Sequence, residues 1–300
     1  MPRVLDEAAL VLEVGSGAGP WSRSDVLVDR FYIDDSGQRG GATIHRDHRP
    51  LLIAAGERLP FVDKAFDFVY CRHVIEHAED IAAFLGEMSR VGKSGYLECP
   101  NPALERVLDQ PQHLWYIANN SGRLLIHPKT KMTQIATCHD RLYFHMMSDH
   151  LLIRNYWDLF VVKLDWHDRI DFELCSNLAQ VLAVEPPEQA VAARVTSERV
   201  GVLRRAWLGA VREDVRGSLV RRLKSMPVGP MAVWLRRTLR ARRAKLLRGR
   251  GSRPENLDVL LCCPHCRGPL THNALEYVCR DCAGAYPIKG GVPVFLLAGG

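Results

Sequence analysis

The chain reads Leu12-Glu13-Val14-Gly15-Ser16-Gly17-Ala18-Gly19 near its start, so an apolar run and an acid lead directly into three glycines at alternate positions. Glycines allow a sharp backbone turn and a close approach to a ligand. A dinucleotide fingerprint would need a further glycine at position 20, where Pro20 stands, and this disfavours a nicotinamide or flavin cofactor. The stretch therefore predicts a ligand-binding turn after the first strand of an α/β protein.

Short apolar runs alternate with polar or helical stretches over the first third of the chain, and this rhythm predicts a Rossmann-like, mostly parallel sheet. The strands are expected at 10–14, 26–28, 51–54, 66–71 and 95–99, the best helix at 79–91 and a possible strand pair within 157–175. Only residues 20–25 separate the glycine turn from the second strand, whereas a parallel crossover normally takes a dozen or more residues. We therefore expect the first helix to be reduced to a loop or a single turn.

The acid-x-Gly-x-Gly-x-Gly spacing resembles motif I of class I S-adenosylmethionine-dependent methyltransferases. Downstream, Leu59-Pro60-Phe61, Phe66-Asp67-Phe68-Val69 and Glu76-His77 are similar, in order and spacing, to the signature of the ubiquinone-biosynthesis-like members. The resemblance covers residues 8–102 and implies S-adenosylmethionine as the cofactor. It also implies methyl transfer to an acceptor that the sequence does not identify, and a small metabolite or glycan and RNA both stay open.

The same resemblance assigns roles to individual residues around the cofactor. The glycine loop would lie under the methionine part, Glu13 would hold the ammonium group, and Asp29 would accept both ribose hydroxyls. Ala55 stands where the family often has an acid that meets adenine, so backbone groups just after it would hold the base. His73 would border the crevice, either as a base or as a cofactor-lining side chain, and His77 is the less favoured candidate for the base. The predicted catalytic residue is His73, and the predicted cofactor-binding residues are Glu13, Gly15, Ser16, Gly17, Gly19, Asp29, Gly56, Glu57 and Arg72.

Residues 73–77 also read His-Val-Ile-Glu-His, the order of an inverted zinc-protease motif. That chemistry needs both histidines within one regular helix, whereas this run directly follows an apolar strand, which argues against zinc hydrolysis. Several side chains further along could line an acceptor pocket or be ordinary surface and core residues. They are His113, Tyr116, His127, His139, Tyr143 and His145.

The carboxyl-terminal part of the chain carries two Cys-x-x-Cys pairs, Cys263 with Cys266 and Cys279 with Cys282. Four thiolates at this spacing predict a closed, structural zinc site whose metal contributes to folding. Cys262 offers an alternative register, although the two-residue spacing favours Cys263. Free thiols without metal are the alternative interpretation.

The segment Tyr286-Pro287-Ile288, followed by Gly291-Val292-Pro293, adds a second resemblance to the cysteine pairs. Together they look like the small zinc-binding activator protein that pairs with methyltransferases of tRNA, rRNA and release factor. The resemblance implies that this unit docks within the chain on an apolar edge of the catalytic sheet. The residues expected to contribute are Val292, Val294, Phe295 and Leu296.

The formal net charge of +6 is unevenly distributed. Residues 194–253 hold 18 Lys and Arg against 3 acids, which is +15, so the remainder carries 22 minus 31, or −9. Such a basic segment could bind RNA or an anionic membrane surface, or could be a solvated tether. The charge pattern alone does not choose among these three.

We expect a methyltransferase domain at 1–193, with its core at 8–102 and a substrate-side cap at 103–193. A basic helical segment and linker would follow at 194–254, and a small zinc-ribbon-like domain at 255–300. The alternative is a catalytically inactive adaptor that recruits RNA or a protein through the basic segment and the ribbon. No run approaches the ~18 apolar residues of a membrane span and no secretory signal is visible, so a cytoplasmic location is expected.

Overall fold

The computed structural model describes residues 5–33, 42–108, 110–129, 157–184 and 256–297. The predicted basic segment at 194–254 lies outside these residues, and so do His139, Tyr143 and His145. Within the described part of the chain, no helix is both long and apolar enough to span a membrane.

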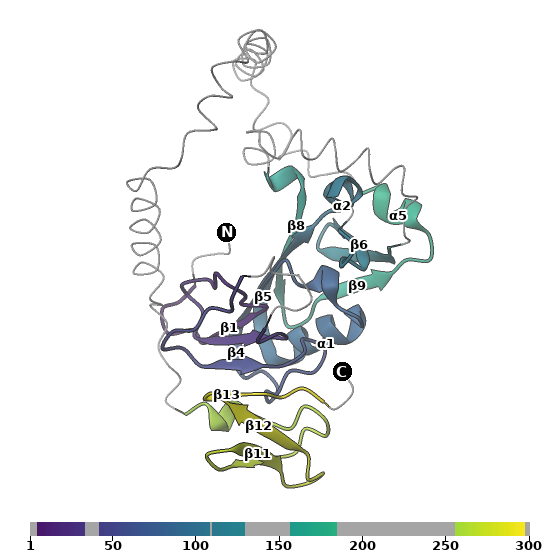
Figure 1. Ribbon diagram of the computed structural model, residues 1–300. Coiled ribbons are helices and arrows are strands. Elements are labelled where there is room, and N and C mark those ends of the chain that lie inside the picture. Colours follow the sequence, from purple (N-terminus) through teal and green to yellow (C-terminus); the bar gives the residue numbers. More distant parts are fainter. Residues whose placement is uncertain (1–4, 34–41, 109, 130–156, 185–255, 298–300) are drawn as a thin grey trace, which may run out of the picture. The chain divides into compact units, whose positions relative to one another are not determined.

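A six-stranded sheet forms the main framework, with the strand order β3-β2-β1-β4-β5-β8 (Figure 1). The first five strands run parallel to one another, and β8 pairs antiparallel with β5 at the edge. The inner strands are buried along almost their whole length, as expected of a parallel sheet covered on both faces. The strands are β1 (Val11–Val14), β2 (Val26–Asp29), β3 (Leu51–Ile53), β4 (Phe66–Arg72), β5 (Gly92–Pro100) and β8 (Val161–His167). The predicted Rossmann-like fold is confirmed.

Helix α1 (Ile81–Val91) connects β4 to β5 and begins two residues later than predicted, after the short 3-10 helix η1 (Ile75–His77). Asp80 sets this start because its side chain accepts a hydrogen bond from the backbone N–H of Ala83 at 2.9 Å. The helix buries one face against the sheet. That face consists of Ile81, Phe84, Leu85, Glu87, Met88 and Val91.

The first crossover contains turns and no helix over residues 20–25, as the short spacing predicts. Side chains fasten it instead, since the Asp25 carboxylate accepts the backbone N–H of Val11 at 2.8 Å. The ring of Trp21 packs against Tyr70 on β4, with centroids 4.7 Å apart. The crossover therefore keeps the parallel connection with tertiary contacts in place of a helix.

A second sheet, of three strands, follows the core and has the order β6-β7-β9. The expected pairing within 157–175 is wrong, because the two strands of that region enter different sheets. Strand β8 pairs with β5, whereas β9 pairs in parallel with β7. The elements of this part are α2 (Pro102–Leu108), β6 (Trp115–Asn120), β7 (Arg123–Pro128), η2 (Trp157–Leu159), β9 (Asp171–Leu174) and α5 (Leu178–Leu182).

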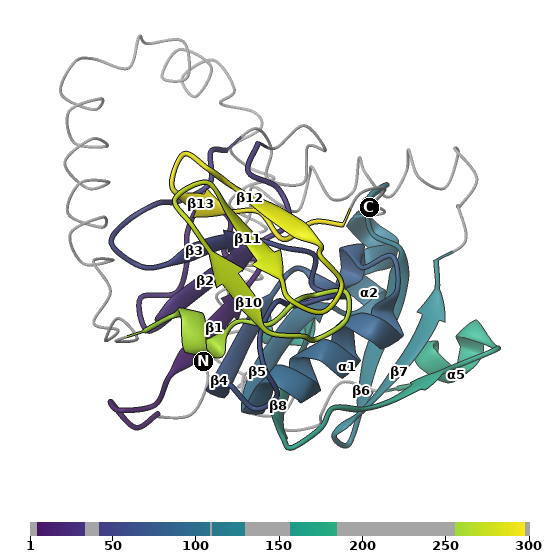
Figure 2. The same ribbon diagram turned by 90° about the horizontal axis from the view of Figure 1, so that it is seen from below.

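The carboxyl-terminal ribbon is a four-stranded antiparallel sheet that follows the 3-10 helix η4 (Asp258–Leu260). Its strands are β10 (Leu270–His272), β11 (Glu276–Cys279), β12 (Ala285–Lys289) and β13 (Val292–Pro293). Figure 2 shows β13 alongside β3, the edge strand of the main sheet. There Val294 forms a parallel bridge with Ile53, and the N–H of Phe295 donates to the carbonyl of Ile53 at 2.7 Å.

Candidate functional site

A cavity opens at the carboxyl ends of β1, β2, β3 and β4, where an open α/β sheet binds its ligands. Glycine backbone, two carboxylates, three basic side chains and aromatic and aliphatic side chains make up its wall. The lining residues are Val14, Gly15, Gly17, Val28, Asp29, Arg30, Phe31, Ala54, Gly56, Glu57, His73, Val74, His77, Ala78 and Phe84.

The glycine turn after β1 forms one side of the cavity and depends on glycine at two positions. Gly15 and Gly17 have φ angles of +78° and +52°, in the left-handed region that side chains rarely adopt. A Cβ atom on Gly15 would lie 2.1 Å from a methyl group of Val74. The Val74 side chain, which follows β4, therefore packs directly against the backbone of the glycine turn. The N–H groups of Gly15 and Ser16 both donate to the carbonyl of Val28.

Asp29 ends β2 and joins the glycine turn to the cavity wall. One carboxylate oxygen accepts the N–H of Gly17 at 2.8 Å and the other accepts the N–H of Phe31 at 3.0 Å. Each carboxylate oxygen can accept more than one hydrogen bond, so these contacts orient the carboxylate while leaving it able to accept ligand hydroxyls. The residue is 7% exposed, at the position where the resemblance expects the ribose contact.

Gly56 lies where α1 approaches the cavity. A Cβ atom there would lie 2.0 Å from the ring of Phe84, so the ring can pack over this position only because it is glycine. Glu57 follows in the wall, and its carboxylate accepts the N–H of Glu79 at 3.1 Å. The two positions predicted to hold the base therefore lie in the cavity wall.

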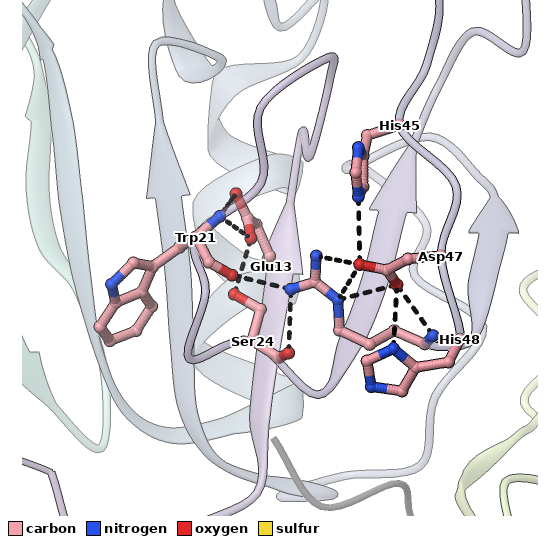
Figure 3. A network of polar contacts seen from close by, with 7 residues as sticks. Glu13, Trp21, Ser24, His45, Asp47 and His48 are labelled. Carbon is pink, nitrogen blue, oxygen red and sulfur yellow. Dashed lines mark hydrogen bonds and ion pairs between the residues drawn. The ribbon is translucent and has the colours of Figure 1, made fainter. Parts of the chain in front are cut away.

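Glu13 is directed into the short crossover and does not line the cavity (Figure 3). Its carboxyl group accepts the N–H of Trp21 at 2.9 Å and the hydroxyl of Ser24 at 2.6 Å. Burial raises the pKa of Glu13 to about 8, although these hydrogen bonds and the positive charge of Arg49 act in the opposite direction. Glu13 thus holds the crossover in place, and its carboxyl group is mainly protonated at neutral pH.

Arg49 extends this network to the loop before β3. Its guanidinium donates to the carbonyl of Trp21 at 2.8 Å and pairs with Asp47 at 2.8 Å. Burial alone would raise the pKa of Asp47, but the hydrogen bonds from Arg49 and His45 lower it to about 2. The N–H of His45 in turn donates to the carbonyl of Gly17 at 2.9 Å, so the network reaches the glycine turn.

His73 lies in the cavity wall between two carboxylates. Its Nδ1 is 3.5 Å from Glu76 and its Nε2 is 3.5 Å from Glu98. Burial lowers the pKa of His73, but the interactions with Glu76 and Glu98 outweigh it and raise the pKa to about 9. The two carboxylates thus favour the protonated form of the ring, and a role of His73 as a base stays a prediction.

Arg72 points to the same carboxylate of Glu98 instead of lining the cavity. Its Nε donates to Glu98 at 2.9 Å, and the Tyr96 hydroxyl donates at 2.6 Å. Burial of Glu98 acts to raise its pKa, but the hydrogen bonds from His73, Tyr96 and Arg72 hold it well below its usual range. Arg72, His73 and Glu98 thus form one charged cluster at the ends of β4 and β5.

The predicted site residues therefore divide into two groups. Gly15, Gly17, Asp29, Gly56, Glu57 and His73 are brought together around the cavity. The structure does not place Glu13, Ser16, Gly19 and Arg72 in the lining, although Ser16 and Gly19 belong to the same turn. Sequence analysis missed Val74, His77 and Phe84 as lining residues. The Glu-His signature could have indicated His77, whereas Phe84 carries only the apolar periodicity of a core residue.

The four predicted zinc ligands of the ribbon lie together. Their sulfur atoms all lie within 4.8 Å of one another, as a tetrahedral thiolate site requires. The four residues are Cys263, Cys266, Cys279 and Cys282. Cys262 is buried and does not belong to this group, which resolves the register in favour of Cys263. The Tyr286 hydroxyl contacts the sulfur of Cys263 at 3.1 Å and orients it from outside the cluster.

The sheet order, the glycine turn and the acid after β2 define a class I, Rossmann-like methyltransferase domain. Comparison with known protein families gives the same assignment, since residues 12–97 match the family of methyltransferase domains. Residues 259–291 match the family of Trm112p-like proteins. The chain thus carries a methyltransferase domain and, at its carboxyl end, a Trm112p-like domain.

Curated relatives match the ribbon. A UPF0434 protein of Methylobacillus flagellatus is 49% identical over 42 residues, which is 13% of this chain and 68% of the relative. A UPF0434 protein of Azotobacter vinelandii is 44% identical over 45 residues, or 14% of this chain and 72% of the relative. The ribbon is therefore similar to small proteins that are little longer than itself.

Solved structures are similar to about a third of this chain, with low TM-scores. The YcgJ protein of Bacillus subtilis is 22% identical with a TM-score of 0.27, over 35% of this chain and 54% of that one. A complex of the Haloferax volcanii Trm112 methyltransferase activator with a methyltransferase gives 17% identity and a TM-score of 0.29, over 39% and 66%. This chain thus spans between half and two thirds of these solved chains.

S-adenosylmethionine is the cofactor of this methyltransferase class, and the residues present suit it. Gly15 and Gly17 both line the cavity, and as glycines they present only backbone to a ligand there. The Ser16 hydroxyl is buried and has no hydrogen-bond partner among the described residues, which leaves a polar group available in the same turn. Zinc suits the ribbon equally, because four cysteine sulfurs converge on one point there.

Proposed function

We propose that this protein transfers the methyl group of S-adenosylmethionine to an acceptor molecule and that the ribbon stabilises the catalytic sheet from within the same chain. The observation that carries the proposal is the cavity where Asp29 and the bare backbone of Gly15 and Gly17 face the same space. When bound there, the cofactor supplies an electrophilic methyl carbon. The work of the protein is then to hold and align the reactants, which supplies much of the acceleration in such a displacement.

The side chains around the cavity support binding and alignment more than proton transfer. Asp29 would accept the ribose hydroxyls, and Gly56 and Glu57 would border the base. His73 carries its proton at neutral pH between Glu76 and Glu98, so we propose that it fixes the wall electrostatically and does not act as a base. An acceptor that is already a good nucleophile fits a site of this kind.

The support for a stabilising ribbon is a continuous interface with β3 and with the loop before β4. Val292 is buried together with Leu27 and Ile53 in one apolar cluster. On the other side of the interface, the N–H of Val62 donates to the carbonyl of Leu260 at 2.9 Å, and the N–H of Cys262 donates to Pro60 at 3.0 Å. The ribbon thus covers an edge strand that would otherwise expose unpaired backbone groups.

One ion pair strengthens the same interface. Arg267 of the ribbon lies 2.6 Å from the carboxylate of Glu87 on α1, which is only 7% exposed. Arg267 also donates to the carbonyl of Leu59 at 2.9 Å. Arg90 shares both partners, so a buried carboxylate and a loop carbonyl are held by one arginine from each domain.

A binding measurement tests the proposal directly. The full-length, zinc-loaded protein is titrated with S-adenosylmethionine in a calorimeter, and we expect micromolar affinity. Asp29→Ala should weaken binding at least tenfold, because the ribose loses its carboxylate partner. Asp165→Ala, at an exposed position of β8, is the matched control and should bind like the wild type. Absence of heat at millimolar cofactor would favour the adaptor function.

A second measurement addresses the acceptor, which we leave as a small metabolite, a glycan or RNA. Fractions of cell extract are incubated with the protein and methyl-labelled cofactor, and are digested with ribonuclease or protease before counting. Label lost only after ribonuclease would identify RNA, and label that survives both digestions would indicate a small molecule or glycan. A cysteine-only zinc site also favours a reducing compartment such as the cytoplasm as the place of action.

A further inference from the structure

A second group of metal-binding side chains lies beside the cofactor cavity, away from the ribbon. It consists of Glu76 and His77, on η1, and His113, just before β6. One donor atom from each lies within 4.8 Å of the other two. The two segments are joined by the backbone, since the N–H of Leu114 donates to the carbonyl of Glu76 at 2.7 Å.

Both imidazole rings are held through Nδ1, which leaves Nε2 of each ring as the nitrogen for a metal. Nδ1 of His77 lies 3.1 Å from the carbonyl of Gln112, and Nδ1 of His113 lies 2.5 Å from the carboxylate of Glu105. Among the described residues, neither Nε2 atom has a hydrogen-bond partner. Metal-bound histidines are typically held in this way, with the outer nitrogen on a carbonyl or carboxylate.

Glu105, which orients His113, is held in place by its own contacts. It is 1% exposed, and its other carboxylate oxygen pairs with Lys129 at 2.6 Å. The ring planes of His77 and His113 cross at 81° with their centroids 4.6 Å apart, so the two rings approach each other from different directions.

Glu76 provides the oxygen donor and is the least satisfied member of the group. It is 2% exposed; one carboxylate oxygen lies 3.5 Å from His73, and Oε2 has no hydrogen-bond partner among the described residues. The His73 ring beside the other oxygen offsets part of the charge of Glu76, but Oε2 itself still lacks a donor or a cation, and such an unpartnered oxygen is costly at this depth. A metal ion between Glu76 and the two histidines would supply a partner for it.

We propose that Glu76, His77 and His113 bind a divalent transition metal of the zinc or iron(II) type. Two imidazoles and one carboxylate are a ligand set of catalytic zinc and of non-haem iron sites, in which further positions stay open. Metal–ligand bonds of about 2.1 Å place tetrahedral donors about 3.4 Å apart, so the three side chains would close by roughly an ångström. His77 also lines the cofactor cavity, so the ion would lie at the cavity wall.

The test uses the full-length protein after the ribbon has been saturated with zinc. Cobalt(II) is then titrated in, and the second site is followed by ligand-field absorption, while thiolate-to-cobalt charge transfer reports any exchange into the ribbon. We expect one equivalent of cobalt without the charge-transfer band. His77→Ala and His113→Ala should each weaken this binding at least tenfold, and His167→Ala, an exposed histidine of β8, should not change it.

Glu105→Gln provides a graded second variant, because Glu105 does not reach the metal and acts only by holding His113. Loss of such an outer partner typically lowers metal affinity about 10- to 100-fold. Cooperative thermal unfolding like that of the wild type, measured before cobalt is added, shows that the methyltransferase domain of each variant is folded. No second equivalent in the wild type, or a second equivalent that persists in both histidine variants, would overturn the proposal. Neither result bears on the proposed binding of S-adenosylmethionine, which is measured separately on the wild type by calorimetry.

Discussion

The cysteine site of the ribbon and the cofactor cavity are constructed in opposite ways. The ribbon gathers four sulfur atoms from one small antiparallel unit, and the donors surround a single point. The cavity instead collects glycine backbone and the carboxylates of Asp29 and Glu57 from the ends of several strands. We therefore expect the ribbon to depend on its metal for folding, whereas the methyltransferase sheet has its own apolar core and should fold without its ligand.

Removal of zinc is expected to have the largest effect. Cys279→Ser, or chelation, should abolish zinc binding and unfold the ribbon, because structural zinc contributes on the order of 10 kcal/mol to small domains. Zinc content by mass spectrometry and thermal unfolding measure the loss. Cys262→Ser is the matched control, since Cys262 is buried beside the site but outside it. Loss of zinc from that control, with retention in Cys279→Ser, would contradict the assigned ligands.

Gly15→Ala should come next and should affect the cavity more than the fold. The new methyl group would lie 2.1 Å from Val74 in a left-handed backbone conformation, at a cost of about 1–3 kcal/mol. We expect cofactor affinity to fall at least tenfold in calorimetry. Gly19→Ala, where a Cβ meets nothing within 4 Å, should bind within twofold of the wild type. An equal loss of cofactor affinity in both variants would indicate that Gly19 also contacts the cofactor.

Arg267→Ala links the two regions and should have a moderate effect. It removes the ion pair with Glu87 and the hydrogen bond to Leu59, but Arg90 still satisfies both partners. The expected loss is about 1–2 kcal/mol of unfolding free energy, measured in urea, with zinc retained. Arg280→Ala, on an exposed turn of the same ribbon, should cost almost nothing. Equal unfolding free energies of the two variants would show that the ion pair between Arg267 and Glu87 does not stabilise the protein.

The pH dependence of Glu13 is the most specific effect. Its pKa is raised to about 8 in the folded protein, so between pH 4.5 and 8 the unfolded chain releases the proton that the folded chain keeps. Stability from this group is thus full below pH 4.5 and falls as the pH rises to 8. The Gln side chain of Glu13→Gln stays neutral at every pH. The melting temperature of this variant should therefore rise relative to that of the wild type as the pH increases from 4.5 to 8. The exposed control Glu7→Gln should show the same pH dependence of melting temperature as the wild type. The same result for Glu13→Gln would contradict the raised pKa of Glu13.

Residues close together in the sequence were predictable, and those whose roles depend on distant partners were not. The strands, helix α1 and the four cysteines follow from local periodicity and spacing, and the Rossmann-like sheet follows from their order. Glu13 also has a motif position, but Trp21 and Ser24 take its carboxyl group because the short crossover brings them there. His73 is similar, since its charge depends on Glu98, one strand away. No local pattern reports these neighbours.

The pairing of Val294 with Ile53 has a consequence for how the protein behaves at low abundance. A separate activator subunit would leave its catalytic partner on dilution, and each half would then face the solvent alone. Here a single polypeptide supplies both halves, so the effective concentration of one for the other is set by the tether and not by expression level. Release of the contact is a local opening that recloses, and activity per chain should not change with dilution.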